Sequence, residues 1–475
     1  MSIRLLLCTL IASFACSAQS TVPDTPAGHQ FSAWLAAFNG GDHAALRQFF
    51  EKNYPSRVAN IGQEFNFRDQ TGGFDFKKTE ESTATRFVAL VKERSSDTFA
   101  RAEMEVDAAE PHQITRFGLR AVPRPSEFPS PRMSEKELIA ALKIKLEQDA
   151  ASDRFAGAVL LAKDGKPVFT GAYGLADREK KISNKLNTRF RIGSMNKMFT
   201  AVSILQLVQA GKIQLTDPLG KYLTDYPNKD VASKVTIHHL LTHTGGTGDF
   251  FGPQYNAHRQ ELRALQDYVT LYGKRDLAFE PGSRWAYSNY GFLLLGLVIE
   301  KVSGVSYYDY VRDHVYKPAG MTSSDSLAED EVVPDRSIGY TKMGETHEHP
   351  NWSPNTDSLP PRATSAGGGY STVEDLLRFA NALAAHNLLN EHYTELLSTG
   401  KLDTPGGGGM KYAYGFGDRT VDGVRSFGHS GGAPGMNGDL EIYPQSGYVV
   451  AVLANMDPQA AGRISDFIGN RLPVK

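Results

Sequence analysis

Cysteine is nearly missing from this chain. The two cysteines, Cys8 and Cys16, both fall in the opening stretch. That stretch has a positive charge at Arg4 and then a short apolar run, Leu5–Cys16, which is typical of a signal peptide. We expect residues 1–18 to be removed. The remaining chain then has no cysteine, which excludes disulfides, cysteine–zinc sites and a thiol nucleophile.

The predicted cleavage site is the small-residue sequence Cys16-Ser17-Ala18, which leaves Gln19 as the new N-terminus. We therefore expect an exported protein, periplasmic or extracellular. The alternative is a lipoprotein anchored through Cys16, but Ser13-Phe14-Ala15 fits a lipobox poorly. The sequence gives no indication of the oligomeric state.

The chain also lacks an excess of either charge and any long apolar run after its start. The formal net charge is -2 and the isoelectric point is about 6.7, so we expect no nucleic-acid partner. Without a later run of about 18 apolar residues, we expect no stable membrane span. The length of 475 residues favours two or three domain-sized units.

Residues 19–122 are expected to form a small α+β cone. Two helical patterns come first, carrying Phe31, Trp34, Leu35 and Phe38, then Leu46, Phe49 and Phe50 after a capping Asp42. Four strand patterns follow, at Gly73–Phe76, Arg86–Lys92, Phe99–Val106 and Gln113–Ala121. The sequence Trp34-x3-Phe38-Asn39-x-Gly41-Asp42 resembles the opening of NTF2-like domains. We expect an accessory domain, because no catalytic set of residues occurs here.

A proline-rich segment, residues 123–133, is expected to be a linker to a larger domain, residues 134–475. That domain opens with a helix over Glu135–Gln148 and a hairpin around Asp164-Gly165. It closes with strands at Asp439–Tyr443 and Tyr448–Asn455 and a last helix. This order predicts one antiparallel sheet shared by both ends of the domain, with a helical insertion packed on it.

The most informative stretch begins at Ser194. From there to Ala210 the sequence has no proline or glycine and shows helical apolar spacing, so we expect a helix ending before Gly211. Ser194 and Lys197 then share one helix face. A lysine amine can accept the serine proton, and N–H groups at a helix start favour an oxyanion. The alternative for this pair alone is a capping serine and a solvated lysine.

Two further motifs follow in order, Tyr287-x-Asn289 and His429-x-Gly431. Together with Ser194-x-x-Lys197, they resemble the serine β-lactamase and penicillin-binding-protein superfamily. The Tyr-x-Asn form resembles the class C β-lactamase-like branch, which also contains esterases and D-stereospecific peptidases. The resemblance implies a β-lactamase/transpeptidase-like domain over residues 134–475.

The resemblance also implies roles for the residues of these motifs. Ser194 would form an acyl-enzyme, and Lys197, as a neutral amine, would keep its hydroxyl activated. Tyr287 would be the partner base and the proton donor to the leaving group, with Lys197 as its polar partner. Asn289 would donate to the substrate carbonyl or hold Lys197. No metal and no cofactor are implied.

The third motif implies the remaining roles. The N–H groups of Ser194 and Gly432 would form the oxyanion hole, and Gly431 would let its strand approach the substrate. His429 stands where β-lactamases usually have a lysine that binds the substrate carboxylate. Because a histidine is mostly neutral at pH 7, it would bind a carboxylate less firmly. His429 therefore favours the esterase or D-aminopeptidase members.

We therefore expect an exported serine hydrolase that acts on a small ester, peptide or amide. The alternatives are a β-lactamase and a penicillin-recognising sensor that is acylated without turnover. Three other features are assigned no catalytic role. His243 is expected to fix a turn, His347-Glu348-His349 to form a solvated loop rather than a metal site, and Gly406–Gly409 to form a flexible loop.

Overall fold

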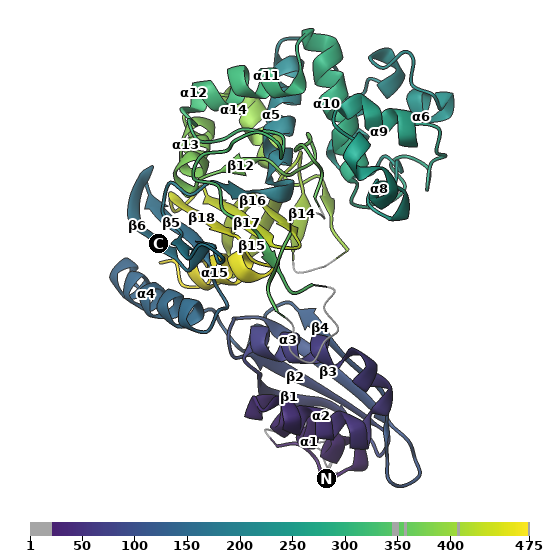
Figure 1. Cartoon of the computed structure of the whole chain (residues 1–475), viewed down its shortest axis with the longest axis vertical. Helices are drawn as coiled ribbons and strands as arrows, with labels where there is room; N and C mark the ends of the chain where they lie inside the picture. The colour runs from purple at the N-terminus through teal and green to yellow at the C-terminus, as the bar shows by residue number, and fades with distance from the viewer. Residues whose placement is uncertain (1–20, 344–350, 356–358, 406–408, 474–475) are drawn as a thin grey trace, which may run out of the picture. The chain divides into compact units, whose positions relative to one another are not determined.

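The structure is a computed structural model that describes residues 21–343, 351–355, 359–405 and 409–473 (Figure 1). The chain divides into two compact units, residues 1–122 and 123–475. The His347-Glu348-His349 sequence and most of the Gly406–Gly409 loop lie outside the described residues. Each unit is described by itself below.

The first unit packs helices against a four-stranded antiparallel sheet in the order β1-β2-β3-β4. Its elements are α1 (Pro26–Gly40), α2 (His43–Asn53), η1 (Pro55–Asn60), α3 (Ile61–Thr71), β1 (Phe74–Ser82), β2 (Arg86–Glu93), β3 (Phe99–Val106) and β4 (Ile114–Val122). The two predicted helices and four strands are present. Trp34 lies at the centre of the core, with its ring centroid 5.1 Å from that of Phe38 and 4.6 Å from that of Phe117.

Helix α3 was not expected from the sequence. Only two large apolar side chains of this helix, Ile61 and Phe65, are buried, and a single i, i+4 pair is too little to establish a helical period. The other helix starts match the sequence better. Asp42 caps α2 as predicted, since its carboxylate accepts the Ala44 N–H at 2.8 Å.

The second unit is built on an eight-stranded antiparallel sheet in the order β13-β14-β15-β16-β17-β18-β5-β6. Its strands are β5 (Gly157–Lys163), β6 (Lys166–Tyr173), β13 (Leu402–Asp403), β14 (Met410–Tyr412), β15 (Gly417–Val421), β16 (Val424–Ala433), β17 (Met436–Tyr443) and β18 (Tyr448–Ala454). Strand β5 pairs with β18, with Gly157 opposite Ala454. The expected sheet shared by both ends of this unit is therefore confirmed.

Helices cover both faces of this sheet (Figure 1). They are α4 (Glu135–Ala151), α5 (Asn196–Gln209), α6 (Lys229–Lys234), α7 (Ile237–Leu241), α8 (Pro253–His258), α9 (Leu265–Tyr272), α10 (Asn289–Ser303), α11 (Tyr307–Val311), α12 (Lys317–Ala319), α13 (Val373–Ala384), α14 (Glu391–Ser398) and α15 (Ala460–Gly469). Strand β18 shows the division: Val450 and Val452 pack with α4 and α15, while Ala451 and Leu453 belong to the core around α5 and α10.

Short elements connect the sheet to the helices. They are β7 (Leu175–Asp177), β8 (Ile182–Ser183), β9 (Phe190–Arg191), β10 (Tyr340–Thr341), β11 (Ser353–Pro354), β12 (Tyr370–Ser371) and the 3₁₀ turns η2 (Gly193–Met195), η3 (Leu219–Lys221) and η4 (Arg259–Glu261), with a π turn η5 (Arg312–Tyr316). Strand β9 pairs with β12, and η2 leads directly into α5.

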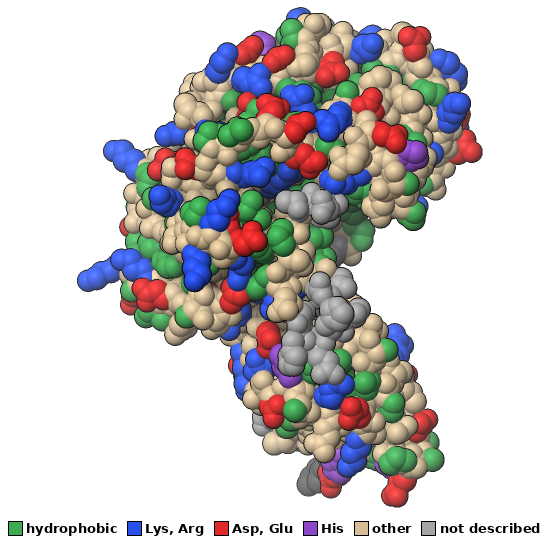
Figure 2. All heavy atoms as spheres, in the orientation of Figure 1, with side chains coloured by type: hydrophobic (Ala, Val, Ile, Leu, Met, Phe, Trp, Pro, Cys, Tyr) green, Lys and Arg blue, Asp and Glu red, His purple; other side chains and the backbone are tan. Residues whose placement is uncertain are grey.

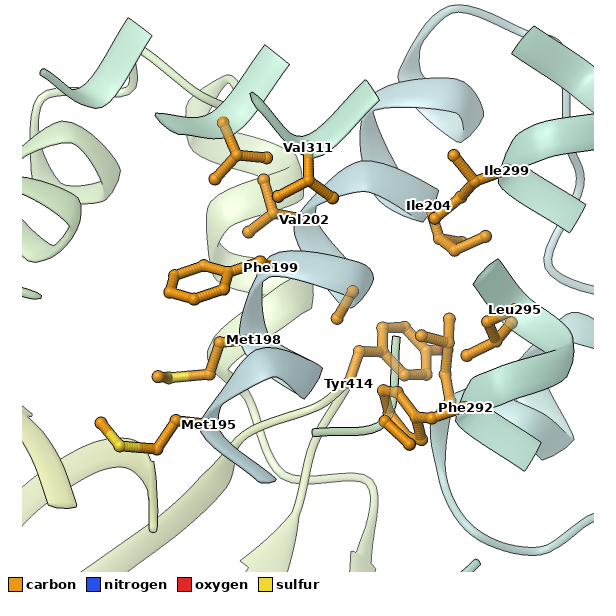
Figure 3. Close-up of a cluster of buried hydrophobic side chains, with 14 of the residues drawn as sticks. Met195, Met198, Phe199, Val202, Ile204, Phe292, Leu295, Ile299, Val311 and Tyr414 are labelled. Atoms are coloured by element: carbon orange, nitrogen blue, oxygen red, sulfur yellow. The ribbon is translucent and has the colours of Figure 1, made fainter. Parts of the chain in front are cut away.

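Helix α5 lies in the middle of the larger core. Every residue from Met195 to Leu205 is buried, and Figure 3 shows Met198, Phe199 and Val202 along it. A helix buried on all sides cannot present a solvated lysine, so the alternative of a solvated Lys197 is excluded. The predicted start was early: the helix begins at Asn196, because Gly193 has a positive φ of 53° and Ser194 lies in the 3₁₀ turn η2.

The surface charges concern the question of a nucleic-acid partner, and the helix lengths concern the question of a membrane span. On the face shown in Figure 2, acidic and basic side chains are intermingled. Within the described part of the chain, no single helix is long and apolar enough to cross a membrane. Two helices taken together, Asn289–Ser303 and Tyr307–Ala319, have the length and composition of a membrane span, but they are bent by 82° relative to each other.

Candidate active site

Backbone contacts on both sides fix the position of Ser194. The Ile192 N–H donates to the Gly369 carbonyl at 2.8 Å, and the Gly368 N–H donates to the Gly193 carbonyl at 3.0 Å. Ser194 follows these bonds directly and lines a pocket of about 640 Å³. The serine is thus held on a rigid turn and faces open space, as a nucleophile requires.

The amine of Lys197 touches three oxygen atoms. Its Nζ lies 3.1 Å from Ser194 Oγ, 2.7 Å from Asn289 Oδ1 and 2.6 Å from the Ala366 carbonyl oxygen. The amide oxygen and the carbonyl oxygen can only accept, so two N–H bonds of Lys197 must point at them. In the neutral amine, the lone pair is then left for the hydroxyl of Ser194.

The surroundings of Lys197 favour that neutral form. The side chain is fully buried, and burial lowers its pKa from 10.5 to about 7, against an opposing effect of the Asp249 charge. Two aromatic ring faces partly offset the cost of burying the positive charge of the ammonium form. Nζ lies 4.7 Å from the ring centroid of Tyr287 and 5.5 Å from that of Phe292. The amine is therefore poised to take up and release a proton near neutral pH.

Asp249 is a member of this site that the sequence did not reveal. Its Oδ2 accepts a hydrogen bond from Asn289 Nδ2 at 2.9 Å, which orients the Asn289 amide so that Oδ1 faces Lys197. Of the two roles implied for Asn289, the structure has the one that holds Lys197. Asp249 follows the Gly245-Gly246-Thr247-Gly248 loop, and nothing in that spacing marks it as a partner of α10.

Tyr287 lies on the other side of Ser194. Its hydroxyl forms a hydrogen bond with Ser194, which lowers the phenol pKa, but burial has the larger effect and raises the pKa well above 10. The phenol is therefore protonated. When Lys197 is neutral and accepts the Ser194 O–H, the Tyr287 hydroxyl donates to Ser194 Oγ. The sequence suggested Lys197 as the polar partner of Tyr287. In the structure, the lysine lies over the ring instead, and Ser194 is the partner.

His243 supports the segment that carries Tyr287. Its Nδ1 accepts the Ser288 N–H at 3.1 Å, and its ring centroid lies 4.3 Å from that of Tyr287. Because Nδ1 accepts, the ring is neutral, and burial lowers its pKa well below 6.5. His243 has a positive φ of 60°, so it lies in a turn, as expected from the sequence.

The third motif contributes backbone to the site. A Cβ atom built on Gly431 would lie 1.9 Å from the Ile192 carbonyl oxygen and 3.0 Å from the Ser194 nitrogen. One built on Gly193 would lie 3.0 Å from the Gly432 nitrogen. Strand β16 and the turn of Ser194 therefore touch backbone to backbone, and only glycine fits at Gly431. This contact brings Ser194 and Gly432 together at the pocket, which both residues line.

Comparisons with known proteins agree with this geometry. Residues 144–473 match the family model described as Beta-lactamase. The chain belongs to the beta-lactamase family. The match lies within the second unit and leaves residues 19–122 outside it. The family expected from the three motifs is thus confirmed.

Within the beta-lactamase family, the similar proteins carry several names. The chain is 31% identical over 301 residues to the putative penicillin-binding protein PbpX of Bacillus subtilis (strain 168), covering 63% of this chain and 70% of the relative. The penicillin-binding protein of Bacillus halodurans has 35% identity and a TM-score of 0.60, covering 68% of this chain and 97% of that one. A D-stereospecific amidohydrolase from Streptomyces sp. has 29% identity and a TM-score of 0.59, covering 70% and 97%.

His429 begins the third motif, and its contacts fix its charge. Its Nδ1 contacts the Ser430 carbonyl oxygen, which can only accept, so Nδ1 carries the proton. Its Nε2 then accepts from the Tyr412 hydroxyl at 3.1 Å. Burial, together with the nearby Lys197 charge, lowers the pKa of His429 to about 3. The imidazole is therefore neutral and both of its nitrogens are occupied.

Proposed function

We propose that the protein is an exported serine hydrolase that cleaves a small ester, peptide or amide through an acyl-enzyme. The observation that carries the proposal is the contact pattern of Lys197. Two acceptor-only oxygens direct its N–H bonds, which leaves the lone pair for Ser194 Oγ at 3.1 Å. A buried lysine with a pKa of about 7 has the properties of a general base at neutral pH.

Acylation then follows from the positions of three side chains. Lys197 takes the proton of Ser194 as Oγ forms a bond to the substrate carbonyl carbon. When the bond to the leaving group breaks, the Tyr287 hydroxyl gives its proton to the departing oxygen or nitrogen. The tyrosinate that remains is reprotonated and the Lys197 ammonium loses its proton, by way of water in the open pocket, so both groups return to their starting protonation states. The products of this step are an acyl-serine and a neutral leaving group.

The backbone supports the charge that develops on the substrate. We propose that the N–H groups of Ser194 and Gly432 bind the oxyanion, since Gly193 and Gly431 bring the two segments into contact. Removing one such donor in other hydrolases costs about 100-fold or more in rate. In deacylation, the same lysine removes a proton from the attacking water, and Ser194 leaves with that proton.

The pocket favours an uncharged acyl group. A neutral His429 offers no positive charge to a substrate carboxylate, which argues against strong β-lactamase activity. The similarity to the Streptomyces D-stereospecific amidohydrolase supports an amide substrate. The similarity to proteins named as penicillin-binding supports the second candidate, a sensor that is acylated without turnover.

The test is the intact mass of the protein after brief exposure to p-nitrophenyl acetate. Wild type should show a transient acetyl adduct with continuing release of nitrophenol. Ser194→Ala should show neither, while Ser283→Ala, at an exposed position, should behave like wild type. A lasting adduct without turnover would favour the sensor. Full turnover by Ser194→Ala would refute the proposal.

For the first part of the chain we propose export, with removal of residues 1–18, and an NTF2-like accessory domain over residues 19–122. The first unit, with its helices on a four-stranded antiparallel sheet, supports the second point. N-terminal sequencing of the protein recovered from the periplasm should begin at Gln19. A protein found in the cytoplasm that still begins at Met1 would contradict export.

A further inference from the structure

The second unit contains another cavity, of about 200 Å³, whose described lining residues are all different from those of the Ser194 pocket. By this measure about 10–15 Å³ holds one water molecule, so the cavity has room for a small organic molecule. Its polar lining includes Arg191, Arg336, Ser337 and Tyr370. All four side chains carry hydrogen-bond donors.

Two guanidinium groups line the cavity, those of Arg191 and Arg336. Among the residues that the structure describes, neither Arg191 nor Arg336 forms an ion pair with a carboxylate. The carboxylate that does line the cavity, Glu329, lies 3.7 Å from Arg259 and is already paired. Two half-buried positive charges at one cavity favour the binding of an anion there.

Tyr370 gives an independent indication of a ligand. The residue is only 1% exposed, yet within the described part of the chain its hydroxyl has no hydrogen-bond partner. Leaving a buried hydroxyl unpaired is costly, so such a group usually has a bound partner. The Arg191 guanidinium carbon lies 5.1 Å from the Tyr370 ring centroid, so the two side chains line the same part of the cavity.

The backbone holds these side chains in place. Arg191 on β9 lies directly opposite Tyr370 on β12. The Arg189 N–H donates to the Asp335 carbonyl at 2.9 Å, and the Ser337 N–H donates to the Arg189 carbonyl at 3.0 Å, so Arg336 is fixed beside the same strand. Three donors from separate parts of the sequence thus converge on one cavity before any ligand is present.

We propose that this cavity is a second ligand site, which binds a small anion through one carboxylate or phosphate group. Arg191 and Arg336 hold the charge, since a planar guanidinium matches both kinds of group, and the Tyr370 hydroxyl donates the third hydrogen bond. The proposal does not depend on the function of Ser194. The second ligand site and the Ser194 pocket are nevertheless linked through the chain, because β9 leads through Ile192 into the turn of Ser194.

Isothermal titration calorimetry tests the site, with succinate and inorganic phosphate as probes and sodium chloride at matched ionic strength as the blank. One probe should bind saturably with a stoichiometry of one, and the probe that binds identifies the anion class. Arg336→Gln and Tyr370→Phe should each weaken binding about tenfold or more. Tyr370→Phe removes a single oxygen and keeps the ring, so this variant still tests the site if Arg336→Gln does not fold.

Two controls separate binding in this cavity from binding elsewhere on the protein. Arg189→Gln removes the same charge from the same segment but does not line the cavity, so it should bind the probe as wild type does. Ser194→Ala should also bind normally, which keeps the result independent of the proposed hydrolysis. Absence of saturable binding, unchanged affinity in Tyr370→Phe, or an equal loss in Arg189→Gln would each overturn the proposal.

Discussion

Asp249 raises the pKa of Lys197 against the larger effect of burial, and its replacement by asparagine is the sharpest test of the site. The carboxylate reaches the amine through the Asn289 amide, with hydrogen bonds of 2.9 Å and 2.7 Å. Its negative charge stabilises the ammonium form and therefore raises the pKa of Lys197. Asp249→Asn keeps the shape and an acceptor oxygen but removes that charge, so the pKa of Lys197 should fall below about 7.

The size of the shift follows from the geometry. Two hydrogen bonds joined by one amide group keep the charges within about 8 Å of each other. With an effective dielectric constant of about 20, unit charges about 8 Å apart interact by about 2 kcal/mol. Since 1.36 kcal/mol corresponds to one pKa unit, the expected decrease is about 1.5 units.

The assay is the pH dependence of kcat/KM for an activated ester, which reports ionisations of the free enzyme. Below the pKa of Lys197 the amine is protonated and has no lone pair, so the wild-type rate should fall about tenfold per pH unit below about pH 7. In Asp249→Asn this acid limb should move down by about 1.5 units. Asp276→Asn is the control, because this exposed carboxylate accepts a hydrogen bond from Asn228 and, within the described ranges, has no contact with the site residues. An acid limb that stays in place or moves up in Asp249→Asn would refute the assignment of Lys197 as the base.

Three further variants test other parts of the site. Tyr287→Phe should lower kcat by about 10²–10⁴. The loss should be larger for an alkyl ester than for a nitrophenyl ester, because only the alkoxide is a poor leaving group that needs a proton. Equal losses for the two esters would exclude Tyr287 as the proton donor. Gly431→Ala should lower the unfolding free energy by about 1–3 kcal/mol and inactivate the enzyme, in contrast to Gly118→Ala, which has open space. His429→Lys should speed acylation by penicillin about tenfold relative to His429→Gln, measured by labelling; no change would show that the missing charge does not limit β-lactam recognition.

The sequence predicted the large elements because their patterns are local. Strand β18 is a continuous apolar run buried on both faces, and the Asp164-Gly165 turn between β5 and β6 has the positive φ angles, 48° and 77°, that this pair favours. The start of α5 was misplaced by two residues because the 3₁₀ turn at Ser194 is imposed by Gly193 and its contact with β16, which no local pattern encodes.

The site was predicted in its members and less well in its contacts. The motif spacing placed Ser194, Lys197 and Tyr287 near one another, but it could not tell which face of Tyr287 meets the lysine. Packing decides that: the amine is directed by Asn289 and the Ala366 carbonyl, and so lies over the ring rather than at the hydroxyl. Asp249 was not predicted for the same reason, since its hydrogen bond to Asn289 exists only once α10 is packed in place.

Two backbone carbonyl groups decide the electrostatics of this pocket. The Ala366 carbonyl fixes one N–H of Lys197, and the Ser430 carbonyl fixes the proton of His429 on Nδ1. A carbonyl cannot reverse its role, so each basic side chain has only one arrangement in its neutral form, and burial lowers the pKa of both. The lysine then keeps a lone pair for Ser194, whereas the lone pair of the histidine is taken by Tyr412. One neutral base is thus available for catalysis and the other is not, and neither offers a fixed positive charge to an anionic substrate.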